Sequence, residues 1–222
     1  MKRWYLYPFS LVYHFVTAMR NRMYDWGIFS STKFKTPIIG VGNLSVGGSG
    51  KSPMVMYMAD LLSKNFRTGV LSRGYGRKTK GYGIVNYDST YKMVGDEAMQ
   101  LFERFRNRFV IGVCEDRVFG ARKIIDDMDL DVLLLDDSYQ HRRIKPGFNI
   151  LLTDYNDPYF KDFLLPAGNL RESRRGAKRA DLIVVTKCPE ILTEEKKQFY
   201  INKIKPRHYQ KVFFSSINYD EN

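Results

Sequence analysis

The sequence predicts an α/β fold, in which a mostly parallel sheet carries helices on both faces and is preceded by an N-terminal amphipathic helix. Short aliphatic runs rich in β-branched residues recur after residue 37, and helical segments separate many of them. Continuous apolar runs of this kind are typical of parallel strands that are buried on both faces. An uncharged aromatic stretch over residues 4–19 predicts the first helix.

The order of the elements follows from these patterns. Strands are predicted at the apolar runs, over residues 37–42, 68–72, 83–87, 109–113, 131–136, 148–153, 181–186 and 210–216. Helices are predicted between them, over residues 52–64, 96–106, 116–127 and 193–203. The first of these helices has one apolar face, formed by Val55, Met58, Ala59 and Leu62.

Length and composition describe a globular protein with an anionic partner. A chain of 222 residues suggests one or two domains, and its hydrophobic content of 44% excludes general disorder. Cys114 and Cys188 cannot form a disulfide framework, which indicates a reducing, intracellular compartment. The formal net charge of +12 indicates nucleic acid, an acidic membrane surface or a phosphorylated substrate as partner.

The N-terminal segment has the composition of a helix that lies in a membrane interface. Residues 4–19 contain no charged side chain, but they are shorter than the ~20 residues that a membrane-spanning helix needs. Basic residues flank the stretch on both sides, as in interfacial helices. The alternative is an N-terminal helix whose aromatic side chains pack into the core.

A glycine-rich loop with Gly-Lys-Ser at its end predicts a phosphate-binding site. It follows a predicted strand and opens a predicted helix, so its amides and the helix N-terminus can surround an anion. Lys51 is expected to reach the β- and γ-phosphates of a nucleotide, and Ser52 to bind Mg²⁺. The loop departs from the strict motif because Ser45 stands where its first glycine would be, which leaves a chance glycine-rich turn as the alternative. The predicted nucleotide-binding residues are Ser45, Val46, Gly47, Gly48, Ser49, Gly50, Lys51 and Ser52.

Two aspartates at the end of the apolar run 132–135 predict a metal site. Asp136 and Asp137 lie at the carboxyl edge of a parallel strand, where such sheets bind ligands. They resemble a Walker B element, which holds Mg²⁺ directly or through water. The alternative is an ordinary turn after a core strand.

Three further polar clusters have both a functional and a structural interpretation. Asp96 begins a helix and could accept a proton from a substrate hydroxyl, or could only complement the helix dipole. Gln140 and His141 follow the two aspartates, either beside the metal or in a solvated basic loop. Arg171 could bind a phosphate, or could form a surface salt bridge with Glu172.

Taken together, the motifs closely resemble those of the tetraacyldisaccharide 4′-kinase family of Gram-negative bacteria. The stretches that carry the resemblance are VGNLSVGGSGKSP (41–53), LSRGYGR (71–77), VGDE (94–97), EDR (115–117), LDDSYQHR (135–142) and LLPAGNLRE (164–172). The resemblance implies transfer of the γ-phosphate of ATP to the 4′-hydroxyl of a lipid A disaccharide 1-phosphate, with Mg²⁺, at the cytoplasmic face of the inner membrane. It also implies a monomer without nucleic-acid partners.

The resemblance assigns roles residue by residue. Asp96 corresponds to the base that takes the hydroxyl proton, and Lys51 to the phosphate-binding lysine. Ser52, Asp136 and Asp137 correspond to the metal site. Positions that line the substrate site in the family correspond to Gln140, His141, Arg171 and Glu172.

Two departures from the family are visible. Ser138 stands where the family usually has glycine, which is expected to cost turn flexibility. Family members are also longer, with a second α/β domain that supplies a histidine, so this chain resembles a truncated form of low activity. The expected organisation is a membrane-interface segment over 1–35, a P-loop kinase domain over 36–208 and the start of a linker over 209–222.

Two competing interpretations remain from the residues alone. A P-loop GTPase or metallochaperone-type NTPase would explain Thr186 and Lys187 at a strand end, but Pro189 stands where guanine recognition requires an aspartate. A basic nucleic-acid-binding protein would explain the charge and the Arg–aromatic loop over 73–77, but the chain has no recognised nucleic-acid module.

Overall fold

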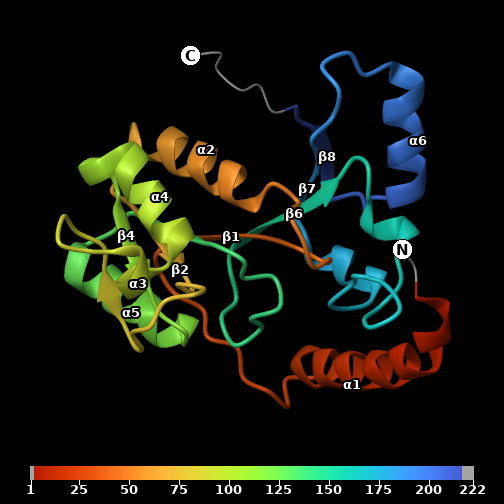
Figure 1. Ribbon diagram of the computed structural model, residues 1–222, viewed down its shortest axis with the longest axis horizontal. Helices are drawn as coiled ribbons and strands as arrows, with labels where there is room; N and C mark the ends of the chain where they lie inside the picture. Colours follow the sequence, from red (N-terminus) through yellow and green to blue (C-terminus); the bar gives the residue numbers. More distant parts are fainter. Residues whose placement is uncertain (1–2, 217–222) are drawn as a thin grey trace. The chain divides into compact units, whose positions relative to one another are not determined.

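A computed structural model describes residues 3–216 of the chain (Figure 1). The chain divides into two compact units. The terminal unit comprises Met1–Phe29, Gly42–Gly50 and Asn149–Asn222, and the central unit comprises Ser30–Val41 and Lys51–Phe148. The two units are described separately below.

The central unit contains a mostly parallel sheet. Its strands are β1 (Ile38–Asn43, of which the first four residues belong to this unit), β2 (Thr68–Ser72), β3 (Gly83–Ile84), β4 (Val110–Val113) and β5 (Val132–Leu135). They are arranged in the order β3-β4-β2-β5-β1, and only β3 runs antiparallel to its neighbour. The parallel sheet predicted from the apolar runs is therefore confirmed.

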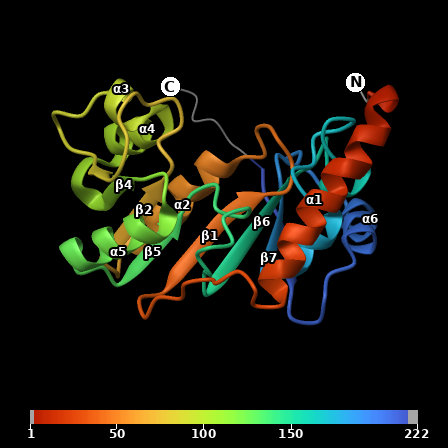
Figure 2. The same ribbon diagram turned by 90° about the horizontal axis from the view of Figure 1, so that it is seen from below.

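Helices cover both faces of this sheet. They are α2 (Lys51–Ser63), α3 (Tyr91–Val94), α4 (Asp96–Phe105) and α5 (Arg117–Met128), with the short 3₁₀ helix η2 (Arg106–Arg108). Helix α2 connects β1 to β2 and helix α4 leads into β4, so both connections run toward the β3 edge of the sheet. Helix α5 connects β4 to β5, in the opposite direction. Because such crossovers are right-handed, α2 and α4 cover one face and α5 the other (Figure 2). On the α5 side, Leu133 and Leu135 pack with Ala121 and Ile124.

The terminal unit contains three parallel strands, β6 (Phe148–Asp154), β7 (Leu182–Thr186) and β8 (Lys211–Phe214). Its helices are η1 (Trp4–Leu6), α1 (Tyr7–Asp25), η3 (Tyr159–Lys161), η4 (Arg174–Arg179) and α6 (Glu194–Ile204). Tyr200 of α6 packs against Val185 and Cys188, and its ring stacks on Tyr155 with centroids 5.1 Å apart. These contacts hold α6 against β7.

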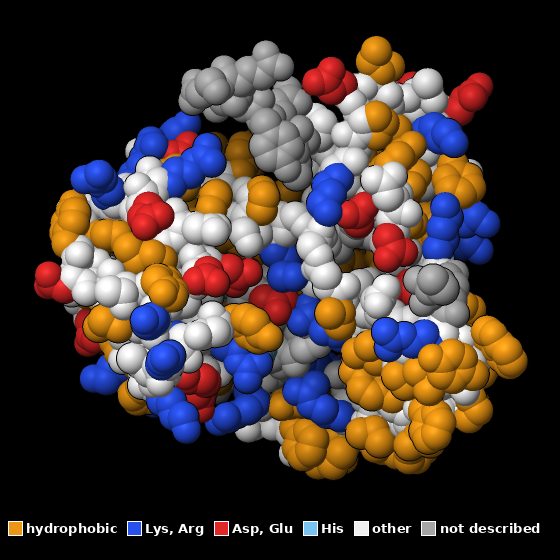
Figure 3. Space-filling view, viewed as in Figure 1, with side chains coloured by type: hydrophobic (Ala, Val, Ile, Leu, Met, Phe, Trp, Pro, Cys, Tyr) orange, Lys and Arg blue, Asp and Glu red, His pale blue; other side chains and the backbone are white. Residues whose placement is uncertain are grey.

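Helix α1 presents its polar face to the protein and its apolar face to solvent. The Ser10 hydroxyl donates to the Leu164 carbonyl at 3.0 Å, and the Tyr13 hydroxyl donates to the Arg171 carbonyl at 2.9 Å. Phe9, Val12 and Phe15 are each at least 64% exposed. Apolar side chains consequently gather over α1 (Figure 3). This exposure contradicts the alternative in which these side chains pack into the core, and the interfacial position of the helix stays a prediction.

No helix among residues 3–216 is long and apolar enough to cross a bilayer.

Two predicted strands are shorter in the structure. The strand predicted over 83–87 ends at Ile84, because the Asn86 side chain accepts hydrogen bonds from the Asp88 amide and the Ser89 hydroxyl and turns the chain. The strand predicted over 210–216 covers Lys211–Phe214. Residues 217–222 of the predicted linker lie outside the described residues.

Candidate active site

In the terminal unit, the glycine-rich loop is fastened to the carboxyl end of β7. The Thr186 hydroxyl donates to the Ser49 carbonyl at 2.9 Å. Gly50 has a φ of +78° and a Cβ there would lie 3.5 Å from Thr186 Cβ, so the loop approaches the strand closely. Gly47 also adopts a positive φ of +118°, which side chains rarely adopt. The loop thus has the curled backbone that the sequence predicts.

Backbone pairing explains why the loop tolerates a serine at its first position. Ser45 forms a β-bridge with Leu170, and the Val46 amide donates to the Asn169 carbonyl at 2.7 Å. This start of the loop is extended, so glycine is not required there. The Val46 amide is already used within the protein, and the Ser49 amide donates to the Gly47 carbonyl at 3.0 Å. A phosphate would therefore have to be bound by the other amides of the loop.

In the central unit, the first turn of α2 carries the lysine and serine of the motif. Lys51 Nζ lies 3.9 Å from Asp137 Oδ1. The Ser52 hydroxyl donates to Glu97 Oε1 at 3.5 Å, which joins α2 to the start of α4. Lys51, the predicted phosphate lysine, and Ser52, a predicted metal ligand, therefore begin the same helix. Through Lys51 this helix start contacts Asp137, a second predicted metal ligand.

Asp136 is a buried carboxylate with an unusual proton affinity. Its side chain is 2% exposed, and Oδ1 has no hydrogen-bond partner among the described residues. Burial, reinforced by the carboxylates of Glu97 and Asp137, raises the pKa of Asp136 from 3.8 to about 7, against the opposing effects of Lys51 and Arg117. A carboxylate in this setting gains from a bound cation.

Arg117 is the buried cation behind this carboxylate. It is 3% exposed, and its guanidinium donates to the Cys114 carbonyl at 2.6 Å and to the Asp136 carbonyl at 3.5 Å. Burial lowers the pKa of Arg117 to about 10, which still leaves it charged at neutral pH. Its hydrogen bonds hold the end of β5 in place.

The turn after β5 is shaped by Asp137 rather than by the residue that follows it. Asp137 has a φ of +44°, whereas Ser138 is not among the residues with positive φ. The Ser138 hydroxyl donates to the Leu135 carbonyl at 3.4 Å, and the His141 amide donates to the Ser138 carbonyl at 2.8 Å. The expected cost of replacing glycine at position 138 does not arise, because the left-handed residue is Asp137. The turn carries Gln140 and His141 just beyond the two aspartates.

These residues fit a magnesium ion. Among residues 3–216, no three Asp, Glu, His or Cys side chains converge as a metal cage does. Mg²⁺ seldom needs such a cage, since it binds one or two carboxylates together with substrate phosphates and water. The unpartnered Asp136 Oδ1, the adjacent Asp137 and the Ser52 hydroxyl provide that kind of ligand set.

Asp96 is the first residue of α4 and is exposed, and no contact joins it to the Lys51–Asp137 pair in the described part of the chain. Gly95 fixes the position of this helix start. Its φ is +89°, and a Cβ would lie 2.6 Å from the Tyr75 carbonyl. The basic loop 73–77 therefore packs against the start of α4, beside Asp96.

Arg171 and Glu172 have different surroundings in the terminal unit. Arg171 donates to the Asn43 carbonyl at 3.2 Å and to the Asn43 side chain, at the base of the glycine-rich loop. Glu172 is 3% exposed and accepts from Asn21 at 2.9 Å and from both terminal nitrogens of Arg179 at 2.8 Å. Glu172 is therefore not a surface carboxylate, because it is buried and forms an ion pair with Arg179.

Three further residues lie next to predicted site residues of their own unit, and they were not among the site residues predicted from the sequence. Glu97 contacts Ser52, and Arg117 supports Asp136. Lys187 forms an ion pair with Asp154 at 2.9 Å, and a Cβ on Gly48 would lie 3.9 Å from its Nζ. Their motifs, GDE, EDR and TK, were visible in the sequence, but only the structure shows which member of each motif makes the contact.

The chain has the features of the class of P-loop nucleotide-binding proteins. These features are a mostly parallel α/β fold, a curled glycine loop, a helix that starts with Lys-Ser, and paired aspartates after a strand. A family model described as tetraacyldisaccharide-1-P 4′-kinase matches residues 2–218. The chain belongs to this family, which confirms the resemblance drawn from the motifs.

Individual relatives agree with the family match. A tetraacyldisaccharide 4′-kinase of Flavobacterium johnsoniae is 46% identical over 97% of this chain and 63% of its own length. One of Bacteroides thetaiotaomicron is 42% identical, over 97% of this chain and 57% of its own length. The crystal structure of LpxK from Aquifex aeolicus in complex with ATP is similar with a TM-score of 0.78 and 41% identity, over 87% of this chain and 63% of that chain. The chain thus spans about 57–63% of these relatives.

Proposed function

We propose that the protein carrying this chain transfers the γ-phosphate of ATP to the 4′-hydroxyl of a tetraacylated disaccharide 1-phosphate, giving lipid IV-A. One observation carries the proposal. The lysine that begins the helix after the glycine-rich loop faces Asp137 at 3.9 Å, next to a buried, partnerless carboxylate oxygen of Asp136. This surplus of carboxylates beside a phosphate lysine fits Mg·ATP, and the chain's family is that of a sugar 4′-kinase.

The residues have distinct roles in this proposal. The loop amides after Val46, other than the Ser49 amide that donates to the Gly47 carbonyl, bind the phosphate tail together with Lys51. They offset the charge that develops on the transferred group. Ser52, Asp136 and Asp137 hold Mg²⁺, which would supply further positive charge at the β- and γ-oxygens. Asp96, exposed at the start of α4, accepts the proton of the attacking hydroxyl. Arg171, Glu172, Gln140 and His141 are proposed to line the substrate side of the site.

Helix α1 suits a substrate that resides in a bilayer. Its exposed aromatic and aliphatic side chains would enter the headgroup region, while its polar face stays on the protein. We place the protein at the cytoplasmic face of the inner membrane, where ATP and the disaccharide lipid can meet.

A transfer assay tests the proposal. The full-length protein is incubated with radiolabelled ATP, Mg²⁺ and tetraacyldisaccharide 1-phosphate in detergent, and labelled lipid is separated by chromatography. Lys51→Ala and Asp96→Ala should each lower turnover by about 10²-fold or more. The matched controls Lys80→Ala and Asp88→Ala remove exposed side chains of the same types and should leave turnover unchanged. Absence of labelled lipid with the unmodified protein, or transfer that is equally fast in Lys51→Ala, would exclude this function.

A further inference from the structure

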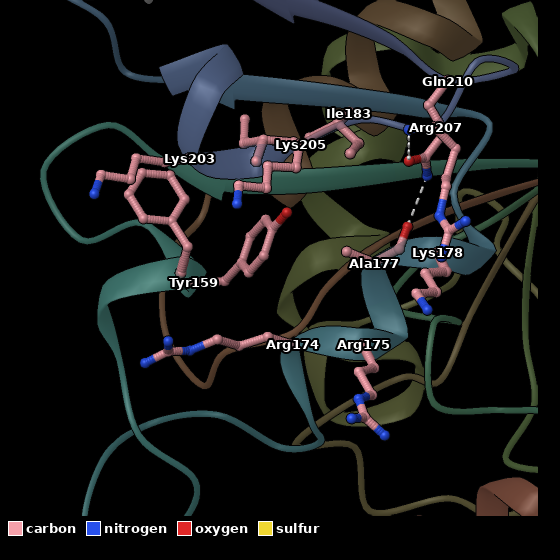
Figure 4. A pocket seen from close by; sticks show the side chains of 12 residues that line it. Tyr159, Arg174, Arg175, Ala177, Lys178, Ile183, Lys203, Lys205, Arg207 and Gln210 are labelled. Atoms are coloured by element: carbon pink, nitrogen blue, oxygen red, sulfur yellow. Dashed lines mark hydrogen bonds between the residues drawn. The ribbon is translucent and has the colours of Figure 1, made fainter. Parts of the chain in front are cut away.

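A second concave site lies in the terminal unit, away from the glycine-rich loop. It is a cavity of about 640 Å³ beside η4, the end of α6 and the segment that leads into β8 (Figure 4). We call it the basic pocket. Its charged lining consists of Arg174, Arg175, Lys178, Lys203, Lys205 and Arg207.

The basic pocket lies at the opposite end of β7 from the glycine-rich loop. Ile183, near the start of β7, lines the pocket, whereas Thr186 at the end of the same strand contacts Ser49 of the loop. Three residues of strand separate these two positions by roughly 10 Å of backbone. The basic pocket is therefore distinct from the proposed nucleotide site.

The cations of the basic pocket are not neutralised by the protein. None of the six forms an ion pair among residues 3–216, and no Asp or Glu is among the described residues that line the cavity. Arg174 donates only to a backbone carbonyl, that of Asp162, at 3.2 and 2.6 Å. Like charges gathered without counter-charges repel one another, and a bound anion would relieve that repulsion.

A buried tyrosine supplies an independent indication of a ligand. Tyr159 is 4% exposed, and its hydroxyl has no hydrogen-bond partner among the described residues. In Figure 4 this hydroxyl points into the basic pocket, on the side of Lys205. Burial raises the pKa of Tyr159 to about 12, so the phenol remains a hydrogen-bond donor at neutral pH. A hydroxyl that opens into a cavity lined by cations and has no partner among the described residues can donate to an anionic oxygen bound there.

The walls of the basic pocket are held together by hydrogen bonds. The Gln210 side chain donates to the carbonyls of Ala177 at 2.8 Å and Ala180 at 2.7 Å, and the Tyr209 hydroxyl donates to the Lys178 carbonyl at 2.7 Å. These bonds tie η4 to the segment before β8. Lys205 has a φ of +51°, a conformation that favours glycine, yet a lysine occupies it and lines the cavity. The cations are thus carried on segments fixed relative to one another.

We infer that the basic pocket is a second anion site, which binds a phosphate ester. Arginine and lysine around a tyrosine hydroxyl match the charge and the acceptor oxygens of a phosphate group. The volume exceeds that of a bare phosphate ion, and Phe160, Ile183 and Ile204 supply apolar contact for an organic part. A lipid headgroup and a soluble phosphate ester share this chemistry, and the experiment separates these two sources.

The test uses the full-length protein with its proposed nucleotide site saturated by a non-hydrolysable ATP analogue. Binding of glycerol 3-phosphate is measured by calorimetry. Binding to vesicles is measured by flotation, with phosphatidylcholine alone and with phosphatidylcholine mixed with phosphatidylglycerol. The pocket variant is Arg175→Gln with Lys205→Gln, and the control is Arg122→Gln with Lys196→Gln, which removes the same charge from exposed positions outside the pocket.

We expect the unmodified protein and the control to bind glycerol 3-phosphate, or to gain affinity for vesicles when phosphatidylglycerol is added. The pocket variant should lose about tenfold or more of that binding. If the pocket variant loses binding of glycerol 3-phosphate, the ligand is a soluble ester. If it loses only the binding to vesicles, the ligand is a lipid headgroup. The pocket variant should unfold at the same or a higher temperature without ligand, because like charges are removed. Equal binding by the pocket variant and the control, or no binding of either probe by the unmodified protein, would overturn the inference.

Discussion

A single buried carboxylate, Asp136, shows most clearly how this sequence favours function over stability. Its Oδ1 has no hydrogen-bond partner among the described residues. Burial, reinforced by the neighbouring carboxylates of Glu97 and Asp137, raises the pKa of Asp136 to about 7. A buried charge without full compensation destabilises a folded protein. The arrangement becomes favourable when a cation joins it, which is the state that the proposed phosphoryl transfer requires.

Replacing Asp136 by asparagine should therefore separate stability from activity. The folded-state pKa lies above the unfolded value of about 4, so the folded protein binds this proton more tightly than the unfolded chain. The favourable contribution is complete below pH 4 and is lost as the pH rises to about 7. In EDTA at pH 8, Asp136→Asn should melt at the same or a higher temperature than the unmodified protein. In the transfer assay with Mg²⁺, the turnover of the proposed 4′-kinase reaction should fall by about 10²-fold.

The measurement is a pair of thermal melts, at pH 5 and pH 8, together with the transfer assay. Asp88→Asn, an exposed aspartate in the same unit, serves as the control and should change neither quantity. A variant that is destabilised at pH 8 and active would show that Asp136 is a structural residue.

At the scale of an element, helix α1 differs from an ordinary surface helix, because its polar side chains face the protein and its apolar side chains face solvent. Ser10 and Tyr13 bond to the body of the terminal unit, and Phe15 and Val16 face outward at 66% and 59% exposure. Polar bonds thus position the helix, and the apolar side chains remain available for a bilayer. The two faces can be tested separately because different residues form them.

Phe15→Ser with Val16→Ser should weaken flotation with vesicles by about tenfold or more, since each buried side chain of this kind contributes about 1.5–3 kcal/mol. The free energy of unfolding should change by less than about 0.5 kcal/mol, because both side chains are exposed. Ser10→Ala is the control variant on the face of α1 that contacts the protein. It removes hydrogen bonds to Leu164 and Ala167 and should cost about 1–3 kcal/mol while leaving vesicle binding intact. If the double variant floated as well as the unmodified protein, the interfacial role of α1 would be refuted.

Helix α5 is capped by Asp116, the residue that precedes Arg117. Asp116 accepts hydrogen bonds from the amides of Val118 at 3.0 Å and Phe119 at 3.2 Å. Burial raises the pKa of Asp116, but these two amides and Arg143 outweigh it and leave the pKa below 3.8. A lowered pKa gives stability that is present above pH 4 and is lost as the pH falls further.

Asp116→Ala should therefore lower the free energy of unfolding by about 0.5–2 kcal/mol at pH 7. The difference from the unmodified protein should shrink below pH 4, as the native carboxylate also becomes protonated. Denaturant titrations at both pH values measure this. A difference that stayed constant with pH would mean that the loss comes from packing and not from the charged cap.

At the scale of the whole molecule, local patterns in the sequence predicted the elements well. Apolar runs such as residues 68–72 and 131–136 coincide closely with β2 and β5, because strands buried on both faces must be apolar throughout. The Gly-Lys-Ser stretch marked the loop for a local reason too, since only glycine readily adopts the positive φ of Gly47 and Gly50.

What the sequence could not predict are contacts between segments that lie far apart in the chain. Glu172 follows Arg171 in the sequence, but only folding brings Asn21 and Arg179 to its carboxylate. The basic pocket also went unnoticed, because its cations come from η4 and from the residues around 203–207. In the sequence these residues contribute only to the formal net charge of +12, which says nothing about their position. Long-range pairing of this kind follows from topology and not from any local pattern.

Binding of Mg·ATP should stabilise the whole protein, because a ligand that binds only the folded state shifts the unfolding equilibrium. At a concentration 100 times its dissociation constant, the ligand adds about 2.7 kcal/mol. For a chain of this size, that corresponds to a rise in melting temperature of roughly 5–11 °C. Lys51→Ala should abolish most of this rise, because the lysine that faces Asp137 is expected to bind the phosphates. Lys80→Ala, which removes an exposed lysine, should retain it. Differential scanning fluorimetry with ATP, with GTP and without nucleotide measures the effect, and an equal rise in Lys51→Ala and the unmodified protein would show that ATP binds elsewhere.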